Sequence, residues 1–345
     1  MKLPFGKIPI DILKDTILKN LGATRKEVIV GPQAGYDGAV IEVGDKALIV
    51  SMDPITGAEQ HIGWLAVNIN SNDVATFGIK PTLFFSCILL PESADKNIIE
   101  TISKQIGKAA RNLGISIAGG HCEVTPGLKK PIIIGCAMGI TEKEKYVVAG
   151  GAKAGDKIIL TKSIGIEGTA ILAIEREQQL LKTLNPILIN NAKKLLDQIS
   201  VVKEAILAFE TGGTNAMHDP TEGGIAGGIH EMADASNLGV SIIESEICIR
   251  DETAQICEAL KIDPLHLISS GSLLIASKPE FAEMIVDVLN SEKIYSRIIG
   301  EFLQDPNQKI IQGTNKKIRK LVRPKKDTLW NVITKPRVQM DTILT

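Results

Sequence analysis

A segment rich in glycine and alanine, residues 149–155 (AGGAKAG), divides the chain into two series of predicted strands and helices. Small residues in such a run are typical of a connection between two folded units. The chain has 345 residues, whereas a single hydrophobic core stops growing at roughly 250. The sequence therefore predicts two domains, residues 35–148 and 149–312, between a leader at 1–34 and a tail at 313–345.

The first series of elements predicts a compact α+β domain. Two β-rich runs separated by Gly44-Asp45-Lys46 predict a hairpin, and a helical pattern then ends before Gly78 and Pro81. A continuous apolar run predicts a buried strand, and isoleucines at three-to-four spacing predict the next helix. We expect the order ββαβαβ, with strands at 38–43, 47–52, 82–90, 115–118 and 131–140 and helices at 59–77 and 98–113.

The second series predicts another α+β domain. Helical patterns fall at about 168–177, 184–210, 223–236, 251–261 and 279–290, and strands at 157–162, 240–245, 272–277 and 296–302. The leader is expected to be helical at about 8–26. The tail from Asn315 carries seven lysine and arginine residues up to Lys326, which predicts a solvated segment.

Composition excludes several classes of protein. The net charge is −1 and only 3% of the residues are aromatic, so the basic surface and stacking platforms of a nucleic-acid binder are missing. No apolar run approaches the roughly 18–20 residues of a membrane span, and the first residues lack the apolar core of a signal peptide, which predicts a cytoplasmic protein. Five cysteines without a CxxC spacing argue against a disulfide framework and a thiolate zinc site.

Three aspartates of the first domain lie beside small residues where predicted elements end: Asp37 in AGYDGAV, Asp53 in SMDP and Asp73 in NSNDVA. Carboxylates in such places are the usual oxygen donors for Mg²⁺. Each aspartate taken alone is better explained as a structural residue, such as a turn former before Gly or Pro. Their joint occurrence favours a metal site.

The helix predicted at 59–77 carries three asparagines, Asn68, Asn70 and Asn72, shortly before Asp73. Asparagine is a poor residue for a helix interior because its side chain competes for backbone hydrogen bonds. The pattern therefore favours a polar role for these side chains. The alternative is fraying of the helix into a loop at Gly78.

The run AGGHCEVTPG follows a predicted strand. Gly119 and Gly120 would let a ligand approach the backbone closely, while His121 and Glu123 offer groups for proton transfer or metal binding. Cys122 beside a histidine raises the alternative of a nucleophile. Neighbouring side chains of a strand point to opposite faces, however, so a packing role is favoured for this thiol.

The run MHDPTEGGIA leads into a predicted helix of the second domain. Gly223 and Gly224 would then form a helix N-terminus that can receive a phosphate through free N–H groups. The alternative is that Asp219 and Thr221 only cap the helix. Neither GxxxxGK[ST] nor GxGxxG occurs, so Walker-type and Rossmann nucleotide sites are not supported.

Taken in order, the motifs resemble one superfamily. They are AGYDGAVI, IVSMDP, AVNINSNDVATFGIKP, AGGHCEVTPG, GDKIILTKSIGIEGTAIL, MHDPTEGGIAGGIHEMA and SSGSLLIA. The combination resembles the PurM-like superfamily of aminoimidazole ribonucleotide (AIR) synthetase, HypE, selenophosphate synthetase and thiamine-monophosphate kinase. The resemblance covers roughly residues 35–305 and is specific only as a combination.

The resemblance implies two α+β domains, a homodimer whose first domains pair into a β-barrel, and ATP with Mg²⁺ in the cleft between domains and subunits. Asp37, Asp53 and Asp73 match positions that hold Mg²⁺ and phosphates, and Asp219 matches a position near the transferred phosphate that also serves the metal. His121 matches a slot filled by Asp, Glu or His in different branches. The further cofactor-binding positions are Asn72, Gly119, Gly120, Lys162, Gly165, Gly223 and Gly224.

The closest branch looks like HypE or like the AIR-synthetase-related proteins, and one departure decides between them. The dehydratases of the HypE branch carry their carbamoyl group on a C-terminal cysteine, whereas the last cysteine here is Cys257. We therefore expect no carbamoylation of the tail and a substrate that comes from a separate molecule. The cysteine or selenocysteine that selenophosphate synthetases carry in their N-terminal loop is also absent before Asp37.

The chemistry implied is ATP-dependent phosphorylation of an amide, carbonyl or other oxygen nucleophile. Such a reaction depends on positioning and on Mg²⁺ more than on covalent catalysis. Asp219, His121, His218 and Glu222 are the candidate catalytic residues. The leading hypothesis is an enzyme acting on a small molecule or a protein-borne carbonyl, and the alternative is a non-catalytic nucleotide-binding partner in a maturation complex.

Overall fold

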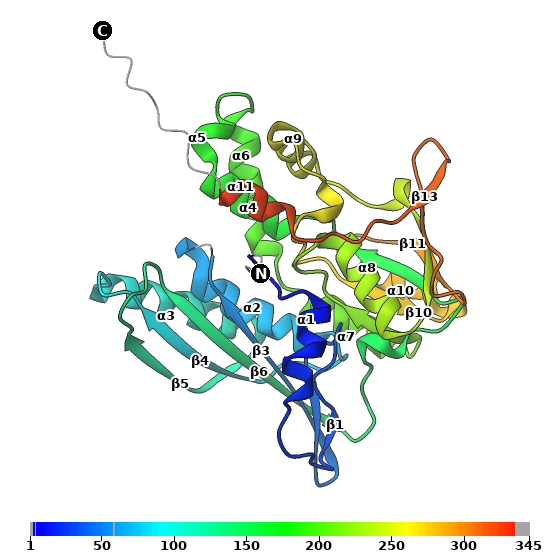
Figure 1. Cartoon of the computed structure of the whole chain (residues 1–345), viewed down its shortest axis with the longest axis horizontal. Coiled ribbons are helices and arrows are strands. Elements are labelled where there is room, and N and C mark those ends of the chain that lie inside the picture. Colours follow the sequence, from blue (N-terminus) through cyan, green and yellow to red (C-terminus); the bar gives the residue numbers. More distant parts are fainter. Residues whose placement is uncertain (1–2, 4, 58, 335–345) are drawn as a thin grey trace.

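The computed structural model describes residues 3, 5–57 and 59–334. Figure 1 shows two α+β units. One is built on a six-stranded sheet and the other on a seven-stranded sheet. The prediction of a two-domain α+β fold is confirmed. None of the described helices combines the length and apolar character needed to cross a membrane.

The sheet of the first domain has the order β1-β2-β3-β6-β4-β5, and its strands are antiparallel except for the parallel pair β4 and β5. From β2 onward the element order is ββαβαββ, and a short β1 precedes it. All five strands with predicted ranges are present, so the predicted order ββαβαβ omitted one of them. The strands are β1 (Val28–Val30), β2 (Ala39–Val43), β3 (Lys46–Ile55), β4 (Leu83–Leu90), β5 (Ser116–Val124) and β6 (Ile132–Glu142).

Two helices of different character belong to this sheet. The amphipathic helix α3 (Lys96–Leu113) begins at Asp95, whose carboxylate accepts the Ile98 N–H at 3.0 Å, and ends at Gly114 with φ 70°. By contrast, α2 (Ile62–Ala75) is buried on nearly every side, because it lies against the sheet and also contacts α7 (Val202–Glu210) of the second domain. Its asparagines are therefore buried rather than frayed.

The second domain has the sheet order β13-β12-β9-β11-β7-β10-β8. Its strands are β7 (Lys157–Thr161), β8 (Thr214–His218), β9 (Gly239–Ile243), β10 (Leu274–Ser277), β11 (Ser296–Leu303), β12 (Lys309–Gln312) and β13 (Ile318–Lys320). Its other helices are α4 (Ile166–Glu175), α5 (Glu177–Leu180), α6 (Pro186–Lys193), α8 (Gly224–Ala235), α9 (Asp251–Leu260), α10 (Pro279–Ser291) and α11 (Thr328–Ile333).

The long helix predicted at 184–210 was wrong in one respect, because it is three pieces. A 3-10 turn (Lys194–Gln198) separates α6 from α7, and the Val201 N–H, instead of continuing a helix, donates to the Asn72 side chain at 2.8 Å. Contact with the first domain thus decides where α7 begins.

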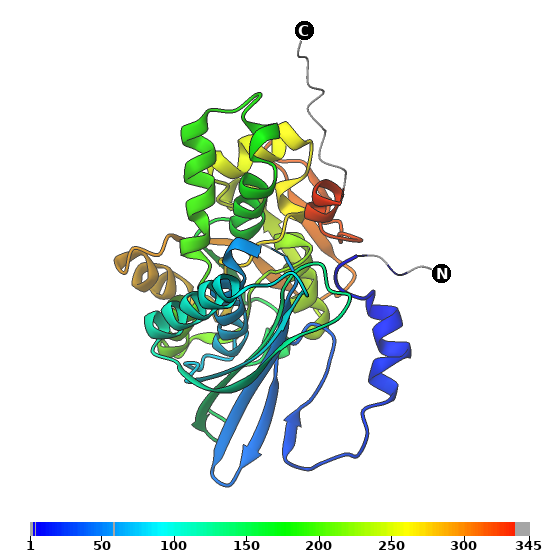
Figure 2. The same cartoon turned by 90° about the vertical axis from the view of Figure 1, so that its left-hand side faces the viewer.

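The prediction of a solvated segment is confirmed for its seven basic residues from Lys316 to Lys326, which are exposed, but the described part of this segment is not a free tail. β13 pairs with β12 and so extends the second sheet, and α11 packs back onto the domain through Leu329 and Val332, which are buried. Residues 335–345 of the predicted tail lie outside the described part. The leader is not one helix but α1 (Ile10–Asp15), a 3-10 turn (Ile17–Lys19) and β1. Figure 2 shows the leader running along the outside of the molecule.

Candidate functional site

Four carboxylates meet where the two domains join. Asp37 precedes β2, Asp53 lies on β3 and Asp73 on α2, while Asp219 comes from the second domain directly after β8. Asp73 and Asp219 are only 3% and 0% exposed. Asp73 feels the negative charge of the other three, and Asp53 and Asp219 both feel that of Asp37, so the aspartates predicted from scattered motifs do share one place.

A buried histidine, His218, lies between a carboxylate of the first domain and a carboxylate of α8. His218 Nδ1 lies 2.5 Å from Asp37 Oδ2, and its Nε2 lies 2.9 Å from Glu231 Oε2 on α8. Ligand atoms of Asp37, His218 and Asp219 lie within 4.8 Å of one another, close enough to hold a metal ion. Because both ring nitrogens of His218 face carboxylates, this geometry suits positioning of Asp37 better than the predicted proton transfer.

Burial and mutual repulsion set the electrostatics of the cluster. Burial first, and then neighbouring carboxylates, raise the pKa of Asp73 and Asp219 well above the usual value. Burial, with smaller contributions from Asp37 and Glu222, raises the pKa of Asp53 to about 6, although Lys7 opposes the shift. Burial disfavours a charged His218, but Asp37 and Glu231 outweigh it and raise the pKa of the imidazole.

The cluster fits a divalent cation. Asp219 is fully buried, and neither of its carboxylate oxygens has a hydrogen-bond partner among the described residues. A buried carboxylate without a partner is costly unless a cation coordinates it. Magnesium prefers such oxygen donors, so Asp37 and Asp219, with Asp53 and Asp73 beside them, form a suitable set.

Polar residues around the cluster hold the aspartates in place. Ser51 Oγ donates to Asp73 Oδ2 at 2.6 Å, and Asn70 Oδ1 accepts the backbone N–H of Asp53 at 2.7 Å. Asn72 bridges the domains, because its side chain donates to Ile199 O at 2.9 Å and accepts from Val201 N at 2.8 Å. The polar role expected for these asparagines is thus positioning, and the Asn72 side chain itself contacts the second domain.

The N-terminus of α8 is already occupied by a carboxylate of the chain. The Gly223 N–H donates to Asp327 Oδ2 at 2.7 Å, and Asp327 is 1% exposed. Gly224 has φ 61°, and an added Cβ would lie 2.6 Å from the Leu267 carbonyl oxygen. These glycines therefore serve a tight turn under the residues 323–330, and the predicted phosphate contact through Gly223 would require Asp327 to move.

Sequence reasoning missed Lys7. Its backbone N–H donates to Glu222 Oε2 at 2.8 Å, and its Nζ lies 4.0 Å from Glu231 Oε1. Although burial opposes the charge, Glu231 and then Asp37, Asp53 and Asp219 raise the pKa of Lys7 above its usual value. Nothing in the sequence signals this contact, which joins residues 215 positions apart.

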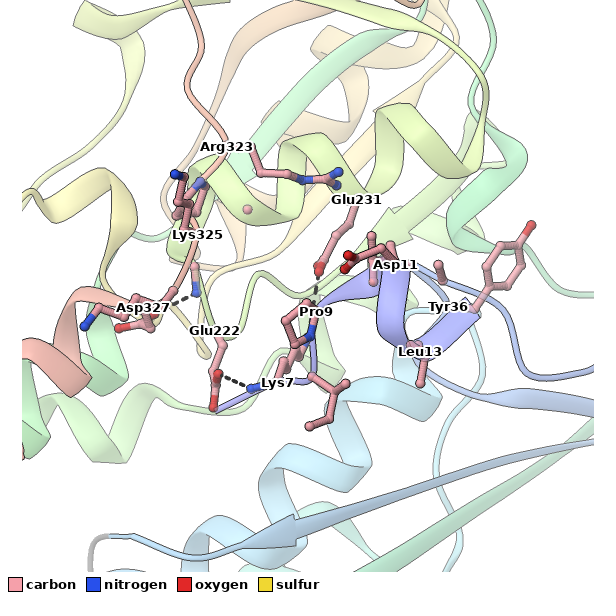
Figure 3. Close-up of a pocket in the computed structure, with 18 of the residues that line it drawn as sticks. Lys7, Pro9, Asp11, Leu13, Tyr36, Glu222, Glu231, Arg323, Lys325 and Asp327 are labelled. Atoms are coloured by element: carbon pink, nitrogen blue, oxygen red, sulfur yellow. Dashed lines mark hydrogen bonds and ion pairs between the residues drawn. The ribbon is translucent and has the colours of Figure 1, made fainter. Parts of the chain in front are cut away.

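A cavity of about 700 Å³ opens beside the cluster. Figure 3 shows its walls, with Lys7 and Leu13 from the leader, Glu222 and Glu231 from the region of α8, and Arg323 from the C-terminal part of the chain. Asp37 also lines this cavity and so connects it with the cluster. A ligand in the cavity would meet residues from both ends of the chain and from both domains.

The organisation of the chain matches a known family over most of its length. Residues 35–141 match the domain described as "AIR synthase related protein, N-terminal domain", and residues 153–312 match "AIR synthase related protein, C-terminal domain". The chain belongs to the AIR synthase related family. These matches confirm the resemblance inferred from the motifs.

Curated relatives of this family member extend over nearly the whole chain. A Methanocaldococcus jannaschii protein named for hydrogenase expression and formation is 33% identical over 314 residues, covering 89% of this chain and 91% of the relative. The carbamoyl dehydratase HypE of Bradyrhizobium diazoefficiens is 26% identical over 290 residues, with 81% and 82% covered.

Solved structures share the fold. HypE in a HypE–HypF complex superposes with a TM-score of 0.77 at 22% identity, covering 91% of this chain and 99% of that chain. HypE in complex with ATP gives a TM-score of 0.72 at 24% identity, covering 95% and 98%.

Three predicted residues of this family member lie away from the cluster. Gly119, Gly120 and His121 belong to β5, the edge strand, where every residue is exposed. The strand order puts β6 and β4 between β5 and the β3 strand of Asp53, a separation of about 14 Å at the usual strand spacing. Within one chain, His121 instead lies 3.1 Å from Glu123.

The predicted rim residues Lys162 and Gly165 have partners within the second domain. Lys162 Nζ donates to Gln198 O at 2.9 Å and Ser200 O at 2.7 Å, and it pairs with Glu204 at 2.7 Å. The Gly165 N–H donates to Ser269 Oγ at 2.7 Å just before α4. Both residues fix the segments around α4 and α7, and a nucleotide contact for either stays a prediction.

Proposed function

We propose that this chain is an ATP- and Mg²⁺-dependent phosphotransfer enzyme of the AIR synthase and HypE type. The observation that carries the proposal is the buried carboxylate cluster, to which both domains contribute and in which neither oxygen of Asp219 has a hydrogen-bond partner among the described residues. Phosphoryl transfer needs this kind of site, because Mg²⁺ bridges carboxylates to nucleotide phosphates and neutralises charge on the transferred group.

The residues of the cluster have separate tasks in this proposal. Asp37, Asp53, Asp73 and Asp219 hold Mg²⁺, while His218 and Glu231 keep the Asp37 carboxylate in its orientation through the two hydrogen bonds described above. A nucleotide held between the two domains would be shielded from water, which favours transfer to the acceptor over hydrolysis of ATP.

The acceptor is a carbamoyl-type amide oxygen on a separate molecule. The support is chemical likeness to relatives named carbamoyl dehydratase. No cysteine is found among the described residues that line the cavity. A carrier group on another molecule would therefore enter the cavity from solvent.

Two copies of the chain pair through the first sheet in this proposal. The edge strand β5 exposes Ile117 and Val124 at 47% and 56%, and Met52 and Ile140 on β3 and β6 are also more than half exposed. An uncovered edge strand with apolar side chains favours pairing with a second copy. Such pairing would bring His121 of one copy toward the cluster of the other.

Turnover of Mg²⁺-ATP against a panel of carbamoyl-bearing peptides and small amides tests the proposal. We expect ADP formation that depends on one class of acceptor, and a higher melting temperature with Mg²⁺-ATP, since ligand at about 100 times its dissociation constant adds about 2.7 kcal/mol. Binding without turnover of any acceptor would favour the non-catalytic alternative. An unchanged melting temperature at millimolar Mg²⁺-ATP would contradict both.

A further inference from the structure

The two ends of the chain touch each other beside the carboxylate cluster. Phe5 stacks on Trp330 of α11 with ring centroids 6.4 Å apart and an angle of 25° between the rings. Gly6 has φ 90°, and a Cβ on it would lie 2.3 Å from Glu222 Oε2 and 2.8 Å from Trp330 Nε1. The leader therefore passes closely between Glu222 and Trp330 before Lys7 reaches the cluster.

The C-terminal side of this contact is firmly built. We call residues 323–330 the strap. Asp327 accepts the Gly223 N–H at 2.7 Å and the Leu329 N–H at 2.8 Å, and Thr328 Oγ1 donates to His266 O at 3.1 Å. Because Asp327 and Leu329 are buried, the strap is fixed to α8 and to the body of the second domain.

The leader residues on the other side of this contact are largely exposed to solvent. Phe5 is 71% exposed, and the Lys7 side chain is 51% exposed despite its position over the cluster. A single stacked ring pair contributes little, and a half-exposed ion pair is weakened by solvent. The leader can therefore be displaced at a cost that a bound ligand could supply.

Charge gives the reason for displacement. Lys7 lines the cavity together with Asp37, and its Nζ lies 4.0 Å from Glu231 Oε1. The negative charges of Asp37, Asp53 and Asp219, which form the candidate Mg²⁺ site, also act on its ammonium group. A divalent ion on these carboxylates would remove the attraction for Lys7 and add repulsion between two cations. The attraction of the Lys7 ammonium group to the carboxylates keeps the leader close to the cluster, whereas a bound divalent ion would drive the leader away.

We propose that Lys7 and Mg²⁺ compete for the carboxylate cluster, and that Phe5 on Trp330 holds the leader closed over the cavity until the metal binds. This inference rests on the proposed function, because it uses the proposed Mg²⁺ site. By linkage, whatever weakens the closed leader strengthens metal binding, and metal binding releases the leader by the same factor. Trp330 acts as a positioning residue through Lys7.

Calorimetric titration with Mg²⁺ alone, without nucleotide, tests the competition. Lys7→Met should bind Mg²⁺ at least about fivefold more tightly than the unmodified chain, as expected when a competing interaction is removed. Lys14→Met, a change on the same leader at an exposed position of α1, is the matched control and should leave the affinity unchanged. Trp330→Ala should raise the Mg²⁺ affinity less than Lys7→Met does. Trp330→Phe keeps an aromatic ring stacked on Phe5, so its Mg²⁺ affinity should equal that of the unmodified chain.

Trp330 also reports on the leader directly. The chain has two tryptophans, so the Trp64→Phe variant leaves Trp330 as the single emitter. We expect Mg²⁺ to shift its emission in that variant and not after Lys7→Met is added. Fluorine NMR of the chain labelled at its tryptophans gives the same readout without the Trp64 change, should that variant fold poorly.

The outcomes separate the two proposals. Equal or weaker Mg²⁺ binding by Lys7→Met would overturn the competition and leave the phosphotransfer site standing. Absence of Mg²⁺ binding by both chains would overturn both proposals. An emission shift that persists in the Lys7→Met background would show that the leader responds to the metal without Lys7, which also overturns the inference.

Discussion

Two histidine-containing motifs have opposite surroundings in this protein. MHDP, at residues 217–220, ends β8 at the domain junction, where His218 and Asp219 are 1% and 0% exposed. GGHCE, at residues 119–123, lies on the edge strand β5, where His121 keeps 64% of its side-chain surface exposed. Residues of the same chain bury His218, whereas they leave most of the His121 side chain exposed to solvent.

The two histidine motifs differ because packing between the domains of one chain surrounds only the first of them. The MHDP site combines a strand end of the second domain with Asp37 and Asp73 of the first, so domain packing within a chain creates it. Packing within the chain explains the glycines of GGHCE, because a Cβ on Gly120 would lie 2.2 Å from the Ser86 carbonyl oxygen. It does not explain His121, whose predicted role in the cluster would require the second copy of the chain proposed above.

The largest effect is expected from removing the buried charge of Asp219 in the MHDP motif. Asp219→Asn should lower Mg²⁺-dependent turnover by at least about 100-fold, because it removes a metal ligand at constant size. Its melting temperature without Mg²⁺ should not fall, since the wild-type carboxylate is buried and repelled by Asp37 and Asp53. Asp45→Asn, in the exposed β2–β3 turn, is the control. A destabilised Asp219→Asn protein would show that Asp219 is a structural cap.

The origin of the second environment can be tested by mixing two inactive variants. If His121 completes the cluster of a partner copy, His121→Ala and Asp219→Asn chains should complement each other, because a mixed dimer contains one intact site. Random exchange at equal amounts would restore about a quarter of the wild-type turnover. Measuring activity before and after subunit exchange decides this. No recovery, with exchange verified by mass, would place both residues in one chain's site or remove His121 from it.

The strength of the domain junction can be measured through Asn72. Asn72→Ala leaves Ile199 O and Val201 N without their partners, and each such loss costs about 1–3 kcal/mol. We expect a melting temperature lower by several degrees with little change in the affinity for ATP. Asn68→Ala is the control, because Asn68 is equally buried but donates only to Trp64 O of its own helix. A large loss of ATP affinity without destabilisation would instead support the cofactor-binding role predicted from the sequence.

The smallest expected effect is the pH dependence of the cluster. The Asp53 pKa of about 6 lies above the unfolded value, so its protonated form favours the folded state, and stability is lost as pH rises from about 4 through 6. His218, whose folded pKa is raised, adds stability that decreases above about pH 6.5. The gain in melting temperature from Mg²⁺ should therefore grow by a few degrees between pH 5 and 7. Asp53→Asn should flatten this growth, and an equal gain at both pH values would contradict it.

Local sequence patterns predicted most of the secondary structure, and they failed where distant segments decide. The isoleucine spacing of α3 and the apolar run of β4 locate these elements because the pattern reports a face buried within one domain. The helix expected at 184–210 breaks before α7, since Asn72 of the other domain takes the Val201 N–H. The tail was judged solvated from its charges, although Leu321, Leu329 and Val332 anchor it.

For the site, the sequence was enough to predict the four oxygen donors for Mg²⁺, which stand beside small residues: Asp37, Asp53, Asp73 and Asp219. Together with the other motifs, these aspartates also indicate the family. Only the tertiary structure decided which of the candidates meet, that His218 lies between Asp37 and Glu231, and that Lys7 reaches the cluster. The physical reason is range. Turn and helix preferences act over a few neighbouring residues, whereas the electrostatic and packing interactions of a site join segments up to 215 positions apart, and their partners exist only after the domains have closed.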